Sequence, residues 1–177
     1  MCQVKIRSAT PADAPRIQAI YAPVVSDTAI SFETETPDVE EMRRRITGTL
    51  VQYPWLVAED AGGLAGYVYA SRYAERLAYR WSVSVAAYVH ADQHRRGIGK
   101  ALYRALFEQL KAAGYCQAYA GITQPNAASV ALHESMGFTP VGIFANAGYK
   151  LGQWHDVGYW QLSLQRPEPP RETLLLS

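Results

Sequence analysis

The chain has 177 residues, of which 49% are hydrophobic and 19% charged, and its formal net charge at pH 7 is +1. This length favours one domain with a substantial core. A nearly neutral chain argues against a general nucleic-acid binder, and no apolar run approaches the roughly 18 residues of a membrane span. We therefore expect neither nucleic acid nor a membrane as a partner.

Cysteine usage and the first residues bear on cellular location. The chain holds two cysteines, Cys2 and Cys116, which are too few for a disulfide framework. Lys5 and Arg7 interrupt the first apolar residues, so no signal peptide is expected. Both observations favour a reducing cytoplasm, where Cys116 would lie in a buried strand as a small apolar residue.

The first half of the chain predicts three strands and two helices. Thr10 and Asp13 have the spacing of a capping box, with Pro11 at the first helical position. Residues 61–63 predict a hairpin turn. The expected elements are a strand at 4–7, a helix from residue 10 with an apolar stripe at Ile17, Ile20 and Tyr21, a helix from 36–37 with Met42, Ile46 and Leu50 at four-residue spacing, and strands at 55–59 and 64–71.

The second half continues with alternating strands and helices. We expect a strand at 81–89, a helix at 99–113 with Leu102, Leu106 and Leu110 facing inward, a strand at 115–122, a helix at 127–136, and strands near 139–144 and 154–164. This order indicates a mixed sheet wrapped by helices. A single domain is expected over residues 1–166, followed by a proline-containing tail over 167–177.

Residues 85–102 combine an apolar strand, a short basic turn and the start of an amphipathic helix. The first turn of a helix has unpaired N–H groups and the positive end of the helix dipole, so such a junction can hold an anion. Gly97 and Gly99 let the backbone approach a ligand, while Arg95, Arg96 and Lys100 add positive charge. The segment indicates a diphosphate site, and an ordinary strand–turn–helix is the alternative.

The spacing of this turn narrows the choice of ligand. It lacks the third glycine of the dinucleotide fingerprint, and Ala101 replaces the Ser or Thr of a P-loop. Residues 94–99 instead resemble the coenzyme A loop of the GNAT acetyltransferases, Gln/Arg-x-x-Gly-x-Gly/Ala. His94 departs from that pattern, because it replaces Gln or Arg.

A second segment resembles another signature of that family. Asn126 leads residues 131–138, which end in Gly137 and Phe138, and the family carries an Asn-led helix ending in Gly-Phe. Asn126 is also a good N-cap and Gly137 a good helix stop, so a purely local role is the alternative. The resemblance implies that the Asn126 side chain meets the pantetheine arm.

The resemblance extends over about residues 4–171. Segments 53–59, 78–81 and 154–162 and the tail residues 167–171 are similar to the phosphinothricin acetyltransferase branch. This likeness implies the GNAT fold, an α/β (α+β) architecture with a mixed, mostly antiparallel sheet of about seven strands and about four helices. In that fold the central strand and the next one part, and acyl-CoA lies in the gap. The implied reaction moves acetyl from acetyl-CoA to the amine of a small amino-acid-like compound, such as phosphinothricin, methionine sulfoximine or methionine sulfone.

The same likeness implies which residues bind the coenzyme. Backbone groups of Ala87, Tyr88 and Val89 would pair with the pantetheine amides in the manner of an added strand, although plain strand packing also explains these residues. The remaining implied contacts are His94, Arg95, Arg96, Gly97, Ile98, Gly99, Lys100 and Ala101 in the turn, and Asn126 and Ser135 further on.

Acetyl transfer needs a route for the amine proton and donors for the developing oxyanion. The branch usually carries a glutamate where this chain has Ser84, so we expect Ser84 either to hold a proton-carrying water or to be an ordinary strand residue. A serine cannot act as a carboxylate base. This favours an α-amine with a pKa of about 8 over a lysine side chain at about 10.4, or else implies weak activity.

Other candidates for proton transfer lie elsewhere. Glu33 and Glu35 precede the second helix, in a segment that borders the acceptor pocket of this fold, and each is either a replacement carboxylate or a solvated turn residue. His133 stands where many family members have a tyrosine thought to protonate the thiolate, and a pKa of about 6.5 suits that role. A packing or capping histidine is the alternative.

The acceptor pocket is expected to be cationic and aromatic. A carboxylate or phosphinate group needs a bidentate partner, which arginine supplies. By resemblance the pocket is formed by Phe32, Glu35, Tyr73, Arg76, Tyr79 and Arg80, and surface arginines with aromatic packing are the alternative. No metal site is expected, because His90 and His94 fall across a strand–turn boundary.

Two other functions stay open. One is a protein or peptide N-acetyltransferase, which would need an open acceptor groove. The other is a non-catalytic acyl-CoA-binding protein, in which Ser84 would stand where the catalytic base has been lost. Dimers are common in this branch, so a homodimer is expected. Residues 174–176 would then pack on the partner or form a disordered end.

Overall fold

The computed structural model describes residues 4–166 and 168–173 and contains one seven-stranded sheet in the order β1-β2-β3-β4-β5-β7-β6. The strands are β1 (Lys5–Ser8), β2 (Trp55–Asp60), β3 (Gly63–Arg72), β4 (Ser82–Val89), β5 (Gln117–Thr123), β6 (Thr139–Lys150) and β7 (Gln153–Ser163). Only the β4–β5 pair is parallel among these neighbours. The predicted mixed, mostly antiparallel sheet is confirmed.

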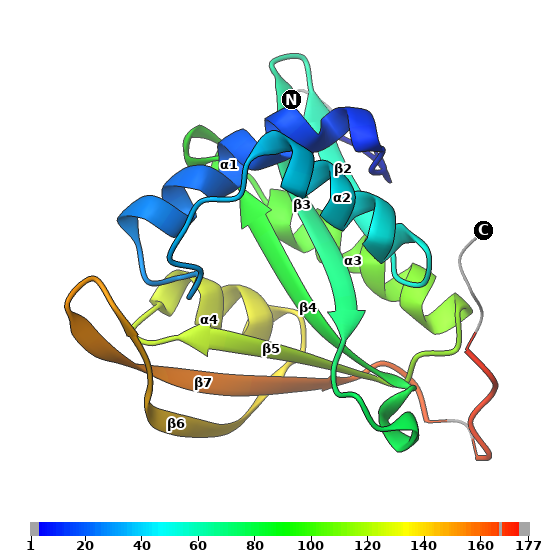
Figure 1. Ribbon diagram of the computed structural model, residues 1–177. Helices are drawn as coiled ribbons and strands as arrows, with labels where there is room; N and C mark the ends of the chain where they lie inside the picture. The colour runs from blue at the N-terminus through cyan, green and yellow to red at the C-terminus, as the bar shows by residue number, and fades with distance from the viewer. Residues whose placement is uncertain (1–3, 167, 174–177) are drawn as a thin grey trace.

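Within residues 4–166 and 168–173, four α-helices cover the sheet on both faces. They are α1 (Ala14–Asp27), α2 (Val39–Leu50), α3 (Ile98–Ala112) and α4 (Ala127–Ser135). In Figure 1, α1 and α2 lie in front of the sheet, while α3 and α4 lie behind it. Alternate residues along a strand face opposite sides of the sheet. In β4, Val83 and Val85 therefore face α3, whereas Tyr88 faces α1. The core is thus divided into two clusters by the sheet.

The predicted helices exist, with shifted boundaries. Leu102, Leu106 and Leu110 are fully buried as predicted. The expected start of the second helix at 36–37 is wrong, because the Asp38 side chain caps α2 by accepting the Glu41 N–H at 2.7 Å.

Three strand boundaries also differ from the prediction. Strand β5 begins at Gln117, so the buried Cys116 lies just before it. Strand β6 continues to Lys150 instead of ending near residue 144, because it resumes its pairing with β7 beyond an irregularity between Phe144 and Gly148. The long β6–β7 hairpin that results forms one end of the sheet.

Strands β4 and β5 part soon after they meet. Their parallel pairing runs only from Ser82 with Gln117 to Ser84 with Tyr119, whereas β4 stays paired with β3 as far as Val89. Strand β5 turns away with β7, to which it is paired up to Thr123. Figure 1 shows the two strands diverging from their shared end. Among the described strands, the β5-facing edge of β4 therefore has no partner from residue 85 to residue 89.

The described part of the tail folds back onto the start of β4. The Trp81 indole donates to the Arg171 carbonyl at 2.6 Å, and Arg80 pairs with Glu172 at 3.0 Å. Residues 174–176, which we expected to pack on a partner or form a disordered end, lie outside the described residues. Within the part of the chain that the structure describes, no helix is long and apolar enough to cross a membrane.

Candidate active site

The gap between β4 and β5 offers unpaired backbone to an extended ligand. Ala87, Tyr88 and Val89 lie along it, as the sequence predicted. The Val89 carbonyl is already engaged by the His94 ring nitrogen at 3.0 Å. His94 therefore ties the turn to the end of β4. The remaining edge of β4 is free to accept a strand-like partner.

Helix α3 begins at the mouth of this gap without a side-chain cap. Its N-cap is Gly97, whose φ of 77° is left-handed, and Arg95 at φ 62° is left-handed as well. A Cβ added to Gly97 would meet no atom within 4 Å, so the space beside it is open. The first N–H groups of this fifteen-residue helix thus face an open turn, and an anion can bind there.

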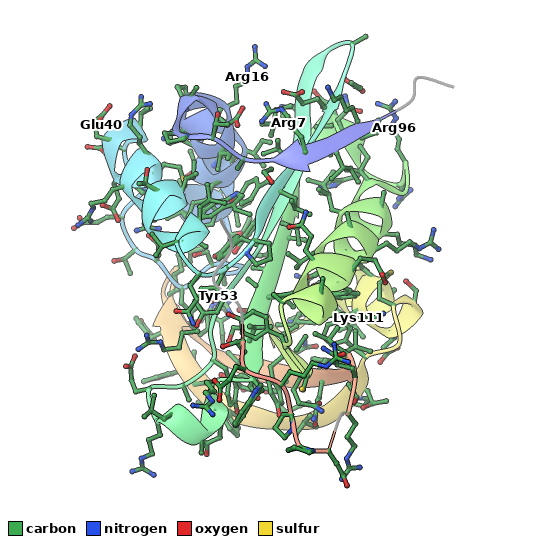
Figure 2. The ribbon with its side chains drawn as sticks, turned by 90° about the vertical axis from the view of Figure 1, so that its right-hand side faces the viewer. Arg7, Arg16, Glu40, Tyr53, Arg96 and Lys111 are labelled. Atoms are coloured by element: carbon green, nitrogen blue, oxygen red, sulfur yellow. The ribbon has the colours of Figure 1, made fainter. Side chains whose placement is uncertain are left out.

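The three basic residues of the turn are not equivalent. Arg96 pairs with Asp60 at the tip of the β2–β3 hairpin at 3.1 Å, and Figure 2 shows it near that hairpin, at the opposite end of α3 from Lys111. Arg95 and Lys100 are exposed and form no ion pair with a described residue. These two side chains are free to meet a diphosphate, whereas Arg96 is held in place.

The other residues assigned to the coenzyme have local partners too. Asn126 caps α4 by accepting the Ser129 N–H at 3.1 Å, which leaves its amide N–H groups for other contacts. The Ser135 hydroxyl donates to the Leu132 carbonyl at 2.7 Å. A Cβ on Gly99 would lie 3.0 Å from the Leu132 side chain. The lack of a side chain at Gly99 therefore lets Leu132 of α4 pack closely on the start of α3, in addition to any role at the ligand.

Ser84 lies where the two strands separate. It is the last β4 residue paired with both β3, through Ser71, and β5, through Tyr119. Residues paired across strands share a face, so Ser84 faces the α1–α2 side together with these two neighbours. The ring of Tyr119 stacks on Tyr73 at 4.2 Å between centroids. No carboxylate replaces the family glutamate at this position.

His133 is a core histidine in this structure. It is 6% exposed, its Nδ1 lies 2.7 Å from the Ser129 carbonyl oxygen, and its Nε2 lies 2.8 Å from the Tyr103 hydroxyl. A neutral ring that donates from Nδ1 and accepts the tyrosine O–H at Nε2 satisfies both contacts. Burial lowers its pKa, which favours that neutral form. The structure shows the packing role, and the role as an acid stays a prediction.

Glu33 and Glu35 lie in different surroundings. Glu33 binds Arg45 through both carboxylate oxygens, at 2.7 and 3.0 Å, and accepts the Tyr21 hydroxyl at 2.8 Å. Although burial opposes ionisation, the hydrogen bonds from Arg45 and Tyr21 lower its pKa, so it is a poor proton acceptor at neutral pH. Glu35 is exposed and borders an open groove.

Two hollows adjoin this network on the α1–α2 side. The groove has a volume of about 440 Å³ and is lined by Phe32, Glu33, Thr34, Glu35, Thr36, Pro37, Glu41 and Arg45. A smaller cavity of about 280 Å³ lies between α2 and the sheet and is lined mainly by Tyr21, Met42, Trp55, Tyr67 and Tyr69. Arg45 borders both, so this half-buried arginine lies between the two spaces.

The expected arginine and tyrosine cluster is only partly assembled. Tyr73 packs edge-on against Tyr79 at 5.6 Å, and both lie near Ser84 through Tyr119. Arg80 stacks over Trp81 at 4.2 Å and pairs with the tail residue Glu172, so its charge is already neutralised. Arg76 is exposed and forms no ion pair with a described residue.

Sequence reasoning missed two residues of the site. In the sequence, Tyr21 is one position of an apolar helical stripe. The contact of its hydroxyl with Glu33 depends on the path of a loop, which no sequence pattern predicts. Arg45 belongs to a run of three arginines, and its four-residue spacing from Glu41 is also typical of an ordinary surface pair, so it was not selected from the sequence. The structure instead places Arg45 between Glu33 and Glu41.

Comparison with known proteins agrees with this geometry. The family described as "Acetyltransferase (GNAT) domain" matches residues 6–158. A phosphinothricin N-acetyltransferase of Streptomyces viridochromogenes is 40% identical over 168 residues, which cover 95% of this chain and 92% of the relative. An L-methionine sulfoximine/L-methionine sulfone acetyltransferase of Salmonella typhimurium is 32% identical, with 93% of this chain and 97% of the relative covered.

A solved structure shows the same arrangement. The GNAT superfamily phosphinothricin acetyltransferase from Sinorhizobium meliloti, in complex with acetyl-CoA, superposes with a TM-score of 0.90 at 33% identity. The match covers 96% of this chain and 93% of that structure. The parting of β4 and β5, the uncapped start of α3 and the family match over most of the chain lead to one conclusion: this chain belongs to the GNAT acetyltransferase family.

Proposed function

We propose that the chain transfers the acetyl group of acetyl-CoA to the α-amine of a small amino-acid-like acceptor of the phosphinothricin, methionine sulfoximine or methionine sulfone type. The observation that carries this proposal is the free edge of β4 leading to the open start of α3. An extended pantetheine arm fits along a strand edge, and a diphosphate fits at a helix N-terminus.

The proposed coenzyme contacts divide by chemistry. The backbone of residues 87–89 would hold the pantetheine amides, and the N–H groups of residues 98–101, with Arg95 and Lys100, would hold the diphosphate. Gly97 leaves the approach open, while His94 and Arg96 keep the turn in position. Asn126 would meet the arm with its free amide N–H groups.

The acceptor would lie on the α1–α2 side of Ser84. The loop carrying Phe32, Glu33 and Glu35 lines the groove on this side, and Tyr73 stacks on the β5 residue that faces Ser84. The acceptor is α-amino rather than lysine-like, because no carboxylate stands at position 84 and the Glu33 carboxylate is engaged by Arg45 and Tyr21. An α-amine is already partly neutral near pH 8.

The reaction then requires little proton chemistry from side chains. The neutral amine nitrogen attacks the thioester carbonyl carbon, the carbon–sulfur bond breaks, and the nitrogen proton passes to water. Ser84 would hold that water. The leaving thiolate needs no dedicated acid, since a thiol with a pKa of about 8.5 leaves readily as its anion. The structure supports this scheme, because neither His133 nor Glu33 has a free proton-transfer position.

We also propose that the protein is a cytoplasmic homodimer. The β6–β7 hairpin exposes a group of large apolar side chains, each about three-fifths exposed: Val141, Ile143, Phe144, Tyr149, Leu151 and Trp154. Large apolar side chains exposed together on one hairpin favour an interaction surface, and we propose that the edge of β6 pairs with a second copy. The free, buried Cys116 fits a reducing compartment in which acetyl-CoA is available.

The test is a thiol-release assay with acetyl-CoA and a panel of amines. The panel contains phosphinothricin, methionine sulfoximine, methionine sulfone, free amino acids, polyamines and peptides. Turnover confined to the amino-acid analogues supports the proposal, and preference for peptides supports a protein acetyltransferase instead. Binding of acetyl-CoA with no turnover on any amine would identify a non-catalytic binder.

Oligomeric state is measured separately, by light scattering of the wild type and of Trp154→Glu. Conversion of a dimer to a monomer by this surface substitution supports the proposed interface. A wild type that is monomeric at micromolar concentration would overturn it.

A further inference from the structure

Lys150, at the end of β6, is a buried cation whose partners are far away in the sequence. The residue is 6% exposed, and its ammonium group donates to the carbonyls of Val25 at 2.7 Å and Ser31 at 2.6 Å. A buried charge is tolerated only where it is hydrogen-bonded. These two bonds therefore tie the β6–β7 hairpin to the end of α1 and to the loop that follows it.

The two carbonyls belong to different structures. Val25 is in the last turn of α1, where carbonyls lack helical partners and a positive charge is favourable. Ser31 is in the loop that leads to the groove, and its hydroxyl contacts Tyr21 at 2.7 Å. Lys150 thus caps a helix and anchors a loop with one side chain.

A second contact joins the same two segments. The Phe32 ring covers Gly148 so closely that a Cβ added there would overlap it, and the ring lies 6.2 Å from that of His155. His155 in turn contacts the Lys150 carbonyl through Nε2 at 3.0 Å. The hairpin therefore forms the surface on which the loop rests.

This contact surface bears directly on the acceptor groove. Phe32 and Glu33, the residues that follow Ser31, line the groove. Glu33 is held on its other side by Arg45 and Tyr21. Without the lysine, the loop would keep its ion pair to α2 and lose its hydrogen bond to the hairpin, so the Phe32 contact alone would hold the groove on that side.

We propose that Lys150 is a positioning residue for acceptor recognition: by binding the Ser31 and Val25 carbonyls, it holds Phe32 and Glu33 where they meet the acceptor. This inference rests on the proposed function, since it assumes that the acceptor enters at the groove. It assigns to the β6–β7 hairpin a share in substrate choice, besides its proposed place in the dimer.

The test compares Lys150→Met with Lys111→Met. Lys111 lies on the exposed face of α3 and pairs only with Glu108 among described residues, so it controls for loss of a lysine. For Lys150→Met we expect the KM of the acceptor to rise by about tenfold or more, with the KM of acetyl-CoA within about twofold of wild type. Lys150→Arg, which keeps a cation and its donors, should recover part of the loss.

Gly148→Ala supplies a second variant that leaves the lysine in place. Its methyl group displaces the Phe32 ring, so the acceptor KM should rise here too. Equal changes in both KM values, or none in either variant, would overturn the inference.

Hydrogen exchange of residues 28–36 separates failure of the inference from failure of the proposed function. If the wild type turns over no amine, the proposed function fails. Faster exchange in this loop in Lys150→Met, with α3 unchanged, would still show that the lysine holds the loop, and unchanged exchange would overturn that as well.

Discussion

The coenzyme side and the acceptor side of this protein are built in different ways. Most of the coenzyme side is made from one stretch of chain, in which β4, the turn and α3 follow directly in sequence, and Asn126 is added from the start of α4. The acceptor side is assembled from segments more than a hundred residues apart, since Lys150 reaches back to Ser31 and Val25. Local chemistry therefore specifies the first, and tertiary packing specifies the second.

The largest effect is expected from breaking the coenzyme side at Gly97. Gly97→Val places a β-branched residue at a φ of 77°, which costs about 1–3 kcal/mol in backbone strain. We expect the acetyl-CoA dissociation constant to rise by about tenfold to a hundredfold, with calorimetry as the measurement. Gly142→Val is the control, because space around Gly142 is also open and its φ is not in the left-handed region. An equal loss of affinity in the control would show that the turn is not the binding site.

The acceptor side is tested by the pH dependence of the reaction. With no carboxylate at position 84, the rate with limiting acceptor should rise about tenfold per pH unit below the pKa of the substrate amine, and level off above it. Ser84→Glu should move this rise to lower pH, because the carboxylate can take the proton. A wild-type profile that is flat between pH 6 and pH 8 would mean that the protein already supplies a base.

His133 distinguishes packing from proton transfer. His133→Phe removes the partner of the buried Tyr103 hydroxyl, which should cost about 1–3 kcal/mol of unfolding free energy. We expect a lower Tm, measured by thermal melting, and a kcat close to wild type. A large fall in kcat with an unchanged Tm would instead assign the acid role to His133.

The same histidine predicts how stability changes with pH. Burial lowers its pKa in the folded protein, so the unfolded chain binds a proton first as the pH falls through about 6.5. The free energy of unfolding contributed by His133 is therefore lost as the pH falls below that value. His133→Phe should flatten the stability curve in this range.

The smallest effects on acetyl-CoA binding are expected for the basic residues of the turn, and these effects should differ in size. Arg95→Gln and Lys100→Gln remove free charges and should each weaken acetyl-CoA binding by about fivefold, with a smaller salt dependence. Arg96→Gln should cost less, because that guanidinium already neutralises Asp60. Titration at two salt concentrations checks this order, and the greatest loss at Arg96 would contradict it.

This contrast also explains what could be predicted from the sequence. The turn at 94–100 and the N-cap at Asn126 depend on glycines, charges and an amide at short spacing, so their local structure was predictable. The contacts of Arg45, Lys150 and Tyr21 depend on how segments distant in the sequence pack together. Hydrophobic periodicity does not predict such packing. Arg80 was expected at the acceptor, and its pairing with Glu172 could not be seen because it depends on where the tail folds.

The parting of β4 and β5 has a consequence for the life of the protein before it meets its ligand. Unpaired N–H and C=O groups along a strand invite any extended peptide to bind there. Without its ligand, the protein would therefore expose an unpaired strand edge that can bind other chains. A bound pantetheine arm would cover this edge. In cells with little acetyl-CoA, the ligand-free protein should therefore be more prone to aggregate. The coenzyme would then protect the protein against aggregation as well as serve as a reactant.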